Sequence, residues 1–482
     1  MPTLIHISDL HRSPDEPIDN DTLLAAVVAD VDRFAISYER PEALIVSGDL
    51  VQGVKLGSAD FKRDIDQQYE VAFDLIRRLS DELLAGDRSK VVIVPGNHDV
   101  CWNTSHAAME HVAPADYPRA LRHSLGERDG QFRWSWDEQR LYRIVQASTY
   151  RDRLGSYWGA LETFYSGTDL PIPIDRARGY HIFSIFDDQA LVAAFESTHR
   201  NDHLRYEAEL CTGVVSRFAM HLRRLGLNPA LLAAVWHHSV NGPPNKEDYL
   251  NIEFIREMAG LGVQIGFHGH QHLAESTDLS VSIGGGTTMS VVSAGSLCAS
   301  WHDLPRGTNR QYNIVRFDPS LSAGTLHVRE MVEGSQFTER TSGRFIGGKV
   351  PLAWTARTDL GGRLVDPRGK RLREITVEVE EAWKHGRKST ATKELLRLTP
   401  PAGTYPRKVL LRALQVEREW ATIFDFFWPT SGVDEAVAMA EAAFQLGNLE
   451  RLEAIMAGGE LPQTFREEFE ARRDLLRLRK EN

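Results

Sequence analysis

The sequence VVIVPGNHD at residues 91–99 decides the fold of this chain. Its first four residues are all β-branched, which predicts a buried strand of a parallel sheet, and Pro95-Gly96 ends that strand. Asn97, His98 and Asp99 follow at the carboxyl end of the strand, where open α/β sheets bind their ligands. The stretch therefore predicts a functional site at one edge of a parallel sheet.

Four further apolar segments also end on residues that bind metal ions. The predicted strands at residues 3–8, 43–46, 231–236 and 262–267 are followed by Asp9-Leu10-His11, Ser47-Gly48-Asp49, His237-His238 and His268-Gly269-His270-Gln271-His272. Residues i and i+2 of an extended chain share a side, so Asp9 and His11 can face one ion. Carboxylates combined with imidazoles suit manganese, iron or zinc.

The segments between the first three strands have the periodicity of helices. Residues 21–34 carry apolar side chains at helical spacing after a cap at Asp19 or Asn20, and residues 64–84 predict a second helix. Strand–helix–strand units of this kind cross over with a right hand. The ends of the first three strands should therefore meet at one edge of the sheet.

The periodicity loosens from residue 101 to about residue 190, where many aromatic residues predict a helical insertion. Near its end, residues 182–186 and 191–195 predict a hairpin, and residues 211–225 predict a helix. Strands expected near residues 290–294, 312–317 and 325–331 would complete a second sheet.

Composition indicates more than one domain and no secretory features. The chain has 482 residues, 42% of them hydrophobic, and two domains are the better expectation for this length. Cys101, Cys211 and Cys298 lie far apart, which argues for a reducing compartment and against disulfides or a zinc–thiolate site. The chain starts on a predicted strand and has no apolar run of membrane-spanning length, so we expect a cytoplasmic protein that does not bind membranes.

The net charge of −11 is concentrated in the first part of the chain. Residues 1–350 carry 34 basic and 46 acidic side chains, whereas residues 351–482 carry 22 and 21. An acidic surface is unusual for a protein that holds long nucleic acid by charge alone. Bound metal ions would change the local balance of charge.

Together, the motifs Asp-x-His, Gly-Asp, Gly-Asn-His-Asp, a His after a strand, and Gly-His-x-His resemble those of the calcineurin-like metallophosphoesterase superfamily, in the same order and over residues 1 to about 335. The resemblance implies an α/β fold of two packed β-sheets flanked by helices. It also implies a set of ligands for two ions: Asp9, His11 and His272 for one, Asn97, His237 and His270 for the other, with Asp49 bridging both. His237 is favoured over His238 because the ligand in this family is the first residue after the strand.

These residue types suit catalysis by two metal ions. Two divalent ions about 3.5–4 Å apart can share a water, lower its pKa and clamp an in-line displacement. We therefore expect two divalent ions, with manganese as the first choice and iron, zinc or nickel as alternatives, and hydrolysis of a phosphodiester by a metal-bridging hydroxide. His98 is the expected general acid. Asp99 either orients His98 or stabilises the turn, and His268 is expected to be structural or to support a ligand.

The sequence leaves three functions open. A phosphodiesterase for a small or cyclic nucleotide-type diester is favoured, because such members of the family begin with a similar Ile-Ser-Asp-Leu-His, here residues 7–11. A DNA or RNA nuclease of the double-strand-break-repair type is an alternative, although Arg12-Ser13 and residues 48–52 depart from its motifs. A partner-binding scaffold without catalysis is disfavoured because every ligand type is present. Asp99 argues against a protein phosphatase, which has glutamate there.

The resemblance does not extend to the last third of the chain. We expect a catalytic domain at residues 1–345, including the aromatic-rich insertion at residues 101–190, and a mostly helical accessory domain at residues 346–482. Gly361-Gly362 and Asp366-Pro367 predict a linker, and a helix pair is predicted around a break at Gly447-Asn448. Residues 362–412 hold 13 basic and 6 acidic side chains. They form either a solvated helical face or a surface for nucleic acid, a protein partner or self-association.

Overall fold

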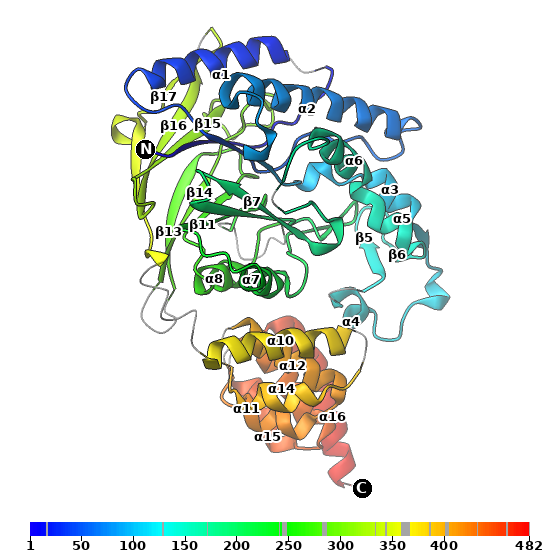
Figure 1. Ribbon diagram of the computed structural model, residues 1–482. Coiled ribbons are helices and arrows are strands. Elements are labelled where there is room, and N and C mark those ends of the chain that lie inside the picture. The colour runs from blue at the N-terminus through cyan, green and yellow to red at the C-terminus, as the bar shows by residue number, and fades with distance from the viewer. Residues whose placement is uncertain are drawn as a thin grey trace. The chain divides into compact units, whose positions relative to one another are not determined.

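A computed structural model gives the fold of the chain. It describes residues 1–481 except 16–17, 128–129, 171, 241, 243–247, 282–286, 333, 343–344, 358–366, 385–386, 401–403, 431 and 459–460. The chain divides into two compact units, one made of Met1–Val214 and Met220–Leu360, the other of Gly361–Asn482 together with Val215–Ala219. Figure 1 shows the elements of both units.

The first sheet contains the three strands predicted at residues 3–8, 43–46 and 91–94. Its order is β17-β16-β15-β1-β2-β3, and β18 also pairs with β16. β1, β2 and β3 are parallel neighbours, whereas β15 runs antiparallel to β1. The strands are β1 (Thr3–Ile7), β2 (Ala43–Val46), β3 (Val91–Ile93), β15 (Gln311–Phe317), β16 (Ala323–Val332), β17 (Gln336–Glu339) and β18 (Lys349–Ala353). β18 lies beyond residue 345, so this sheet extends past the expected end of the catalytic domain.

The second sheet has the order β13-β14-β12-β11-β8-β7. The hairpin expected near residue 187 is β7 and β8, which pair antiparallel, while β8, β11, β12 and β14 run parallel. The strands are β7 (Tyr180–Ile185), β8 (Ala190–Phe195), β11 (Leu231–Val235), β12 (Ile265–His268), β13 (Glu275–Val281) and β14 (Thr287–Ser293).

The two sheets share one hydrophobic core, to which Ile7 and Val46 contribute from the first sheet and Val235 and Ile265 from the second. Helices α1 and α2 lie on the outer side of the first sheet, and α7 and α8 on the outer side of the second (Figure 1). Their bounds are α1 (Asn20–Ala35), α2 (Phe61–Leu84), α7 (Val214–Arg224) and α8 (Ile252–Gly260). The predicted fold of two packed sheets flanked by helices is confirmed.

Helix α1 has both the cap and the buried apolar face that the sequence pattern predicted. The Asp19 carboxylate accepts the Thr22 N–H at 2.7 Å, which is the predicted cap. The apolar positions face inward, and Leu23, Val27 and Val31 are at most 1% exposed. Burial of this apolar stripe against a sheet gives the helix most of its stability. Burying each large apolar side chain contributes about 1.5–3 kcal/mol.

The aromatic-rich insertion is helical only in part. Tyr157, Trp158 and Phe164 are core residues on a helix, as expected, but the expectation of a helical insertion is wrong for the segment before them. It contains a three-stranded sheet of order β4-β6-β5 among its helices. Trp134 lies on one of these strands and Trp136 follows it with 82% of its surface exposed, so neither belongs to a helical core. The elements of this region are α3 (Trp102–Ala107), β4 (Met109–His111), α4 (Leu121–Gly126), β5 (Phe132–Ser135), β6 (Arg140–Ile144), α5 (Ala147–Arg151) and α6 (Gly155–Phe164). A separate two-stranded sheet, β9 (Arg200–Asp202) and β10 (Arg205–Glu207), follows β8.

The described part of the second unit is helical, as expected. Its helices are α10 (Pro367–Lys384), α11 (Thr390–Arg397), α12 (Tyr405–Glu417), α13 (Trp420–Phe426), α14 (Val433–Gln445), α15 (Leu449–Ala457) and α16 (Gln463–Glu481). The predicted break is present, because Gly447 has φ 69° and the Asn448 side chain caps α15. The predicted linker at Gly361-Gly362 and Asp366 lies outside the described residues. Among the described helices, none has the length and apolar character needed to cross a membrane.

Candidate metal centre

The carboxyl ends of β1, β2 and β3 bring the first set of predicted site residues together. The Asp9 N–H donates to the Gly48 carbonyl at 3.0 Å, and the His11 N–H donates to the Asp49 carbonyl at 2.9 Å. Asn97 begins a single 3₁₀ turn, Asn97–Asp99, just after β3. The loops after three adjacent parallel strands therefore lie side by side, as right-handed crossovers require.

The ends of two strands of the second sheet meet the same place. His237 follows β11, and its carbonyl accepts the Gly269 N–H at 3.0 Å. The His270 N–H donates to the Asp9 carboxylate at 3.0 Å, which joins the loop after β12 to the loop after β1. The site is thus built from both sheets, and all seven predicted ligands lie within it.

Five of these seven residues have a left-handed backbone. The φ angles are 51° at Asp9, 44° at His11, 52° at Asp49, 77° at His270 and 54° at His272. Positive φ is uncommon outside glycine and costs of the order of 1–3 kcal/mol when the surroundings impose it. Such strain, gathered at the ends of strands, is typical of functional sites.

Four side chains form a compact cluster with the donor types of a metal site. The ligand atoms of Asp9, His11, Asp49 and His272 all lie within 4.8 Å of one another. His272 Nε2 is 3.0 Å from His11 Nε2 and 3.4 Å from Asp9 Oδ1. Two imidazole nitrogens and two carboxylates in one small volume suit a divalent transition-metal ion.

A second group of donors lies on the other side of Asp49. Asn97 Oδ1 is 3.0 Å from His237 Nε2 and 3.1 Å from His270 Nδ1. Asp49 Oδ2 is 3.2 Å from His237 Nε2 and 3.6 Å from His11 Nε2. One carboxylate oxygen therefore faces both groups, which is the place that a ligand shared by two ions would need.

Backbone carbonyls orient two of the imidazoles. His237 Nδ1 is 2.8 Å from the Ser47 carbonyl, and His272 Nδ1 is 2.6 Å from the Asp303 carbonyl. A ring that donates its Nδ1–H in this way presents the lone pair of Nε2 to the cluster. Sequence reasoning did not find Ser47 and Asp303, because they act through main-chain atoms that any residue would supply.

Comparison with protein families gives a match to the calcineurin-like phosphoesterase model over residues 2–274, more than half of the chain. The chain belongs to the calcineurin-like phosphoesterase family. Comparison with curated protein sequences gives no match.

Similar solved structures include a dimetal phosphatase from Danio rerio, with 11% identity, a TM-score of 0.38, and coverage of 73% of this chain and 99% of that one. The purple acid phosphatase PPD1 from yellow lupin (Lupinus luteus) seeds has 12% identity and a TM-score of 0.37. That match covers 73% of this chain and only 53% of the lupin protein. A 5'-nucleotidase from Candida albicans has 12% identity, a TM-score of 0.35, and coverage of 77% and 57%.

The carboxylates and imidazoles in the candidate centre of this calcineurin-like phosphoesterase carry opposite charges. Burial lowers the pKa of His237, but the charge and hydrogen bond of the Asp49 carboxylate, the Asp9 carboxylate and the Ser47 carbonyl together raise that pKa to about 9. Burial and the Asp9 carboxylate act in the same opposed way on His272, whose pKa also rises to about 9. Buried carboxylates need positive charge beside them. Protonated imidazoles supply it here, and divalent ions can supply it in their place, so the residues present fit the metals of the family.

His98 lies at the rim of the centre. Its side chain is exposed, and its ring is 4.5 Å from that of His11 between centroids. His98 Nδ1 is 2.8 Å from the Gln52 carbonyl, which fixes the ring and leaves Nε2 for another partner. The His98 N–H donates to Asp49 Oδ1 at 2.8 Å, so the same residue also positions the shared carboxylate.

The described hydrogen bonds of the Asp99 side chain go to the turn after β3, to the loop after β2 and to Tyr69. Its Oδ2 accepts the Gly96 N–H at 2.7 Å and the Leu50 N–H at 3.2 Å, and its Oδ1 accepts the Tyr69 hydroxyl at 3.0 Å. Burial, followed by the nearby Asp49 carboxylate, raises the pKa of Asp99 to about 7, while these three donors lower it. Asp99 therefore ties the turn after β3 to the loop after β2.

Two glycines are needed for the ligands to fit. A Cβ at Gly96 would overlap the Asp49 carboxylate, and a Cβ at Gly48 would lie 2.6 Å from His237 Nδ1.

The two histidines that were not predicted as ligands, His238 and His268, contact other side chains. His238 is fully buried with Nδ1 2.8 Å from Ser197 Oγ, and His268 stacks on Trp236 with 6.0 Å between ring centroids.

Proposed function

We propose that this calcineurin-like phosphoesterase hydrolyses a phosphodiester with two divalent metal ions, and that the substrate is a small or cyclic nucleotide-type diester. The observation that carries the proposal is the position of Asp49 Oδ2, 3.6 Å from His11 Nε2 and 3.2 Å from His237 Nε2. Two groups of donors share one carboxylate there. Family membership supports the coarser statement that the chain is a metal-dependent phosphohydrolase.

The seven ligands divide into two sets in this proposal. Asp9, His11 and His272 would hold one ion, Asn97, His237 and His270 the other, and Asp49 both. When bound, two such ions supply Lewis acidity and a water of lowered pKa. The mixed oxygen and nitrogen donors favour manganese, with iron, zinc and nickel as alternatives.

His98 is the proton donor in this proposal. A leaving alkoxide needs a proton, and an imidazole at the rim can deliver one to the leaving oxygen from Nε2 while the Gln52 carbonyl holds Nδ1. Because the His98 side chain is exposed, a substrate can reach it.

A nuclease is the second candidate, and exposed basic residues favour it. Arg387, Lys388 and Lys393 are exposed in the second unit, where a polyanion could contact them. Arg371 of the same basic stretch is less available, because Glu394 holds its guanidinium at 2.6 Å and 2.9 Å. The net charge of −11 opposes this candidate. A scaffold without catalysis would have no need for all seven ligands in one place.

We also propose a cytoplasmic location, which rests on the cysteines. Cys101, Cys211 and Cys298 are free cysteines, which suits a reducing compartment. Fractionation of cells followed by immunodetection would check it.

One activity screen tests the proposed function. The protein is loaded with manganese and assayed against bis-p-nitrophenyl phosphate, cyclic nucleotides, single- and double-stranded DNA, and RNA, with chelator-treated protein as the control. We expect chelator-sensitive hydrolysis of the small diesters that exceeds any hydrolysis of DNA or RNA. Preference for the polynucleotides would establish the nuclease instead, and inactivity on every substrate with metal bound would leave the scaffold.

A further inference from the structure

The ring of His98 contacts a loop made of residues 52–57, which is part of the connection from β2 to α2. The Gln52 carbonyl, at the start of this loop, lies 2.8 Å from His98 Nδ1. A Cβ added at Gly53 would lie 3.3 Å from the His98 carbonyl oxygen, so the main chain of the loop also packs directly against this residue. The position of the loop therefore decides where the His98 ring finds its hydrogen-bond partner.

The side chain of Gln68, on α2, binds both main-chain groups of Gly53. Its Oε1 accepts the Gly53 N–H at 3.0 Å, and its Nε2 donates to the Gly53 carbonyl at 3.2 Å. Gln68 belongs to the buried face of the helix, with Ile65 and Ala72. A buried amide without partners costs about 1–3 kcal/mol, and Gly53 supplies a partner for each end of this one. The pair of hydrogen bonds fixes both the place and the orientation of the Gly53 main chain.

Asn103, on α3, holds the far end of the same loop in the same way. Its Oδ1 accepts the Gly57 N–H at 2.7 Å, and its Nδ2 donates to the Lys55 carbonyl at 3.0 Å. Asn103 is also buried. The loop itself contains two glycines with positive φ, 84° at Gly53 and 86° at Gly57, which supply no side chain to pack. Its conformation therefore depends on the two amides that reach it from neighbouring helices.

The residue after Gln68 supports the other side of His98. The Tyr69 hydroxyl donates at 3.0 Å to the carboxylate of Asp99, the chain neighbour of His98. Two consecutive residues of α2 thus hold the turn that carries His98 and the loop that contacts its ring. Neither Gln68 nor Asn103 is among the predicted metal ligands, so their effect on His98 can be separated from an effect on metal binding.

We propose that Gln68 and Asn103 are positioning residues for proton transfer by His98. They hold the Gln52 carbonyl where it accepts Nδ1–H of the imidazole and so directs Nε2 toward the leaving oxygen. A carboxamide suits this role because it has both a donor and an acceptor, whereas methionine and leucine have neither. The inference rests on the proposed function for the role of His98 as proton donor. The effect of the two amides on the His98 ring does not depend on that role.

Nitrogen NMR of the full chain labelled with ¹⁵N-histidine tests the effect on the ring, in EDTA and at a mildly alkaline pH where free imidazole is neutral. The His98 signals are identified by their loss in His98→Asn. We expect Nδ1 to carry the proton in the wild type, because it faces a carbonyl. Gln68→Met should shift the signals toward the form protonated on Nε2. Gln67→Met is the matched control, since Gln67 is the exposed neighbour on the same helix, and it should leave the signals unchanged.

Kinetics of the manganese-loaded protein test the effect on proton transfer. Gln68→Met should lower kcat for a diester with a poor leaving group by about tenfold or more, because the proton donor is misplaced. The rate on a p-nitrophenyl diester, the KM and the metal content should stay close to those of the wild type. Added to His98→Asn, Gln68→Met should lower the rate no further, because no imidazole remains to be positioned.

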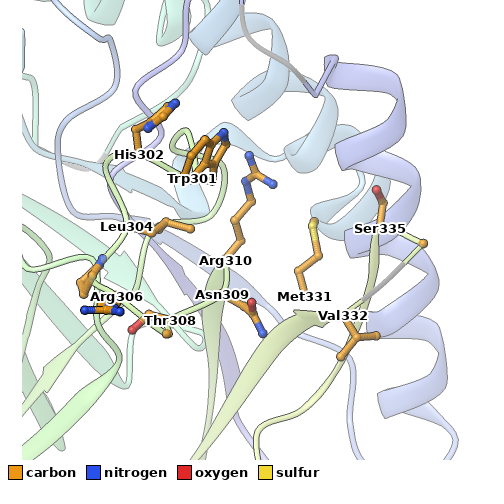
Figure 2. A pocket seen from close by; sticks show the side chains of 13 residues that line it. Trp301, His302, Leu304, Arg306, Thr308, Asn309, Arg310, Met331, Val332 and Ser335 are labelled. Atoms are coloured by element: carbon orange, nitrogen blue, oxygen red, sulfur yellow. The ribbon is translucent and has the colours of Figure 1, made fainter.

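Asn103→Leu is a second variant with the same expected results in both experiments. Its matched control is Asn309→Leu, because Asn309 is an exposed carboxamide that lines a pocket containing none of the predicted ligands (Figure 2). Circular dichroism would confirm that each variant is folded.

Unchanged His98 signals in both Gln68→Met and Asn103→Leu would overturn the proposal. An equal loss of rate on the two diesters would also overturn it, as would a further loss when Gln68→Met is added to His98→Asn. These outcomes are separable from the proposed function. Altered His98 signals in a protein that hydrolyses no diester support the positioning of the ring and reject the proposed function, whereas diester hydrolysis with unaltered signals rejects the positioning alone.

Discussion

At the scale of single residues, Asp49 has the most demanding position in the candidate centre. The His98 N–H occupies one carboxylate oxygen, and the other faces His11 and His237. Its backbone is left-handed, and Gly96 leaves no more space than the carboxylate needs. The side chain therefore has one available orientation, which is the one that a shared metal ligand requires.

We expect Asp49→Asn to lose activity and most bound metal while the fold stays intact, because an amide is a weak metal ligand that carries no negative charge. Elemental analysis of the purified variant and its circular dichroism spectrum would check both parts. Asp303→Asn is the matched control, since Asp303 supports His272 only through its carbonyl. Metal content in Asp49→Asn equal to that of the control would count against the shared-ligand assignment.

His98→Asn should keep both ions, because the residue contributes a proton and is not among the proposed ligands. Turnover of a diester with a poor leaving group should fall by about 10²–10⁴-fold. The loss should shrink with a p-nitrophenyl ester, whose leaving group scarcely needs a proton. Steady-state rates on both substrates would show the difference, and equal losses would mean that His98 has another role.

At the scale of elements, the turn after β3 depends on a residue without a side chain. Gly96 has φ −111°, which any residue can adopt, so alanine would fail there because its Cβ would overlap both the carboxylate and the backbone nitrogen of Asp49. We expect Gly96→Ala to lower metal content and activity with little change in the circular dichroism spectrum. Gly159→Ala within α6 is the control, because a Cβ there meets nothing and should stabilise the helix by about 0.5–1 kcal/mol. Normal metal binding by Gly96→Ala would show that the loop can adjust.

The contact between β16 and α1 contains a histidine that should make folding sensitive to acid. His327 is 1% exposed, packs on Phe34 at 5.1 Å, and among the described residues neither ring nitrogen has a hydrogen-bond partner. Burial, then the nearby arginines, lowers its pKa from 6.5 to about 4. In the unfolded chain the His327 imidazole binds a proton near pH 6.5, whereas in the folded protein it stays neutral down to about pH 4. The folded protein therefore loses stability as the pH falls from about 6.5 toward 4.

His327→Phe should remove this contribution, which amounts to about 2 kcal/mol between pH 7 and pH 5. The melting temperature of the variant should therefore decrease less than that of the wild type over the same pH interval. His123→Gln is the control, because the side chain of His123 is 79% exposed. If the melting temperature of His327→Phe fell as much between pH 7 and pH 5 as that of the wild type, His327 would be protonated in the folded state.

Most elements around the site could be predicted because their apolar patterns match how they are buried. β2 agrees with its predicted bounds, and the cap of α1 at Asp19 is present. The insertion could not be predicted so well, since its strands are only three to five residues long and β5 buries the polar Arg133 and Ser135, leaving the aromatic residues of that strand partly exposed. The ligand types could be predicted from their order in the chain. The carbonyl partners of His237 and His272 could not, because main-chain contacts leave no trace in residue identity.

At the scale of the whole molecule, the two candidate functions differ in what they require of the second unit. A nuclease needs phosphate contacts beyond the metal centre, and the exposed Arg387, Lys388 and Lys393 are available for them. A phosphodiesterase for small substrates needs none of these residues. Sequence alone could not separate the two, because a basic helical stretch can be either a solvated face or a binding surface.

Changing Arg387, Lys388 and Lys393 together to Glu separates them. We expect the rate on a small diester to stay nearly unchanged, with no steep salt dependence of oligonucleotide binding in the intact protein. A nuclease would behave differently, because each lost phosphate contact would reduce the slope of log affinity against log salt by about one. Binding of a long labelled oligonucleotide at several salt concentrations, measured by fluorescence anisotropy, would distinguish the two results.

The backbone is left-handed at five positions, Asp9, His11, Asp49, His270 and His272. This conformation limits the residue types that can replace them during evolution. Aspartate, asparagine and histidine are the side chains most often tolerated at positive φ, and the same three coordinate metal ions. A new residue at one of these positions must therefore tolerate a positive φ as well as coordinate a metal ion. We therefore expect natural substitutions at these positions to exchange aspartate, asparagine and histidine for one another. A β-branched aliphatic residue should disrupt both the conformation of the loop and the binding of metal.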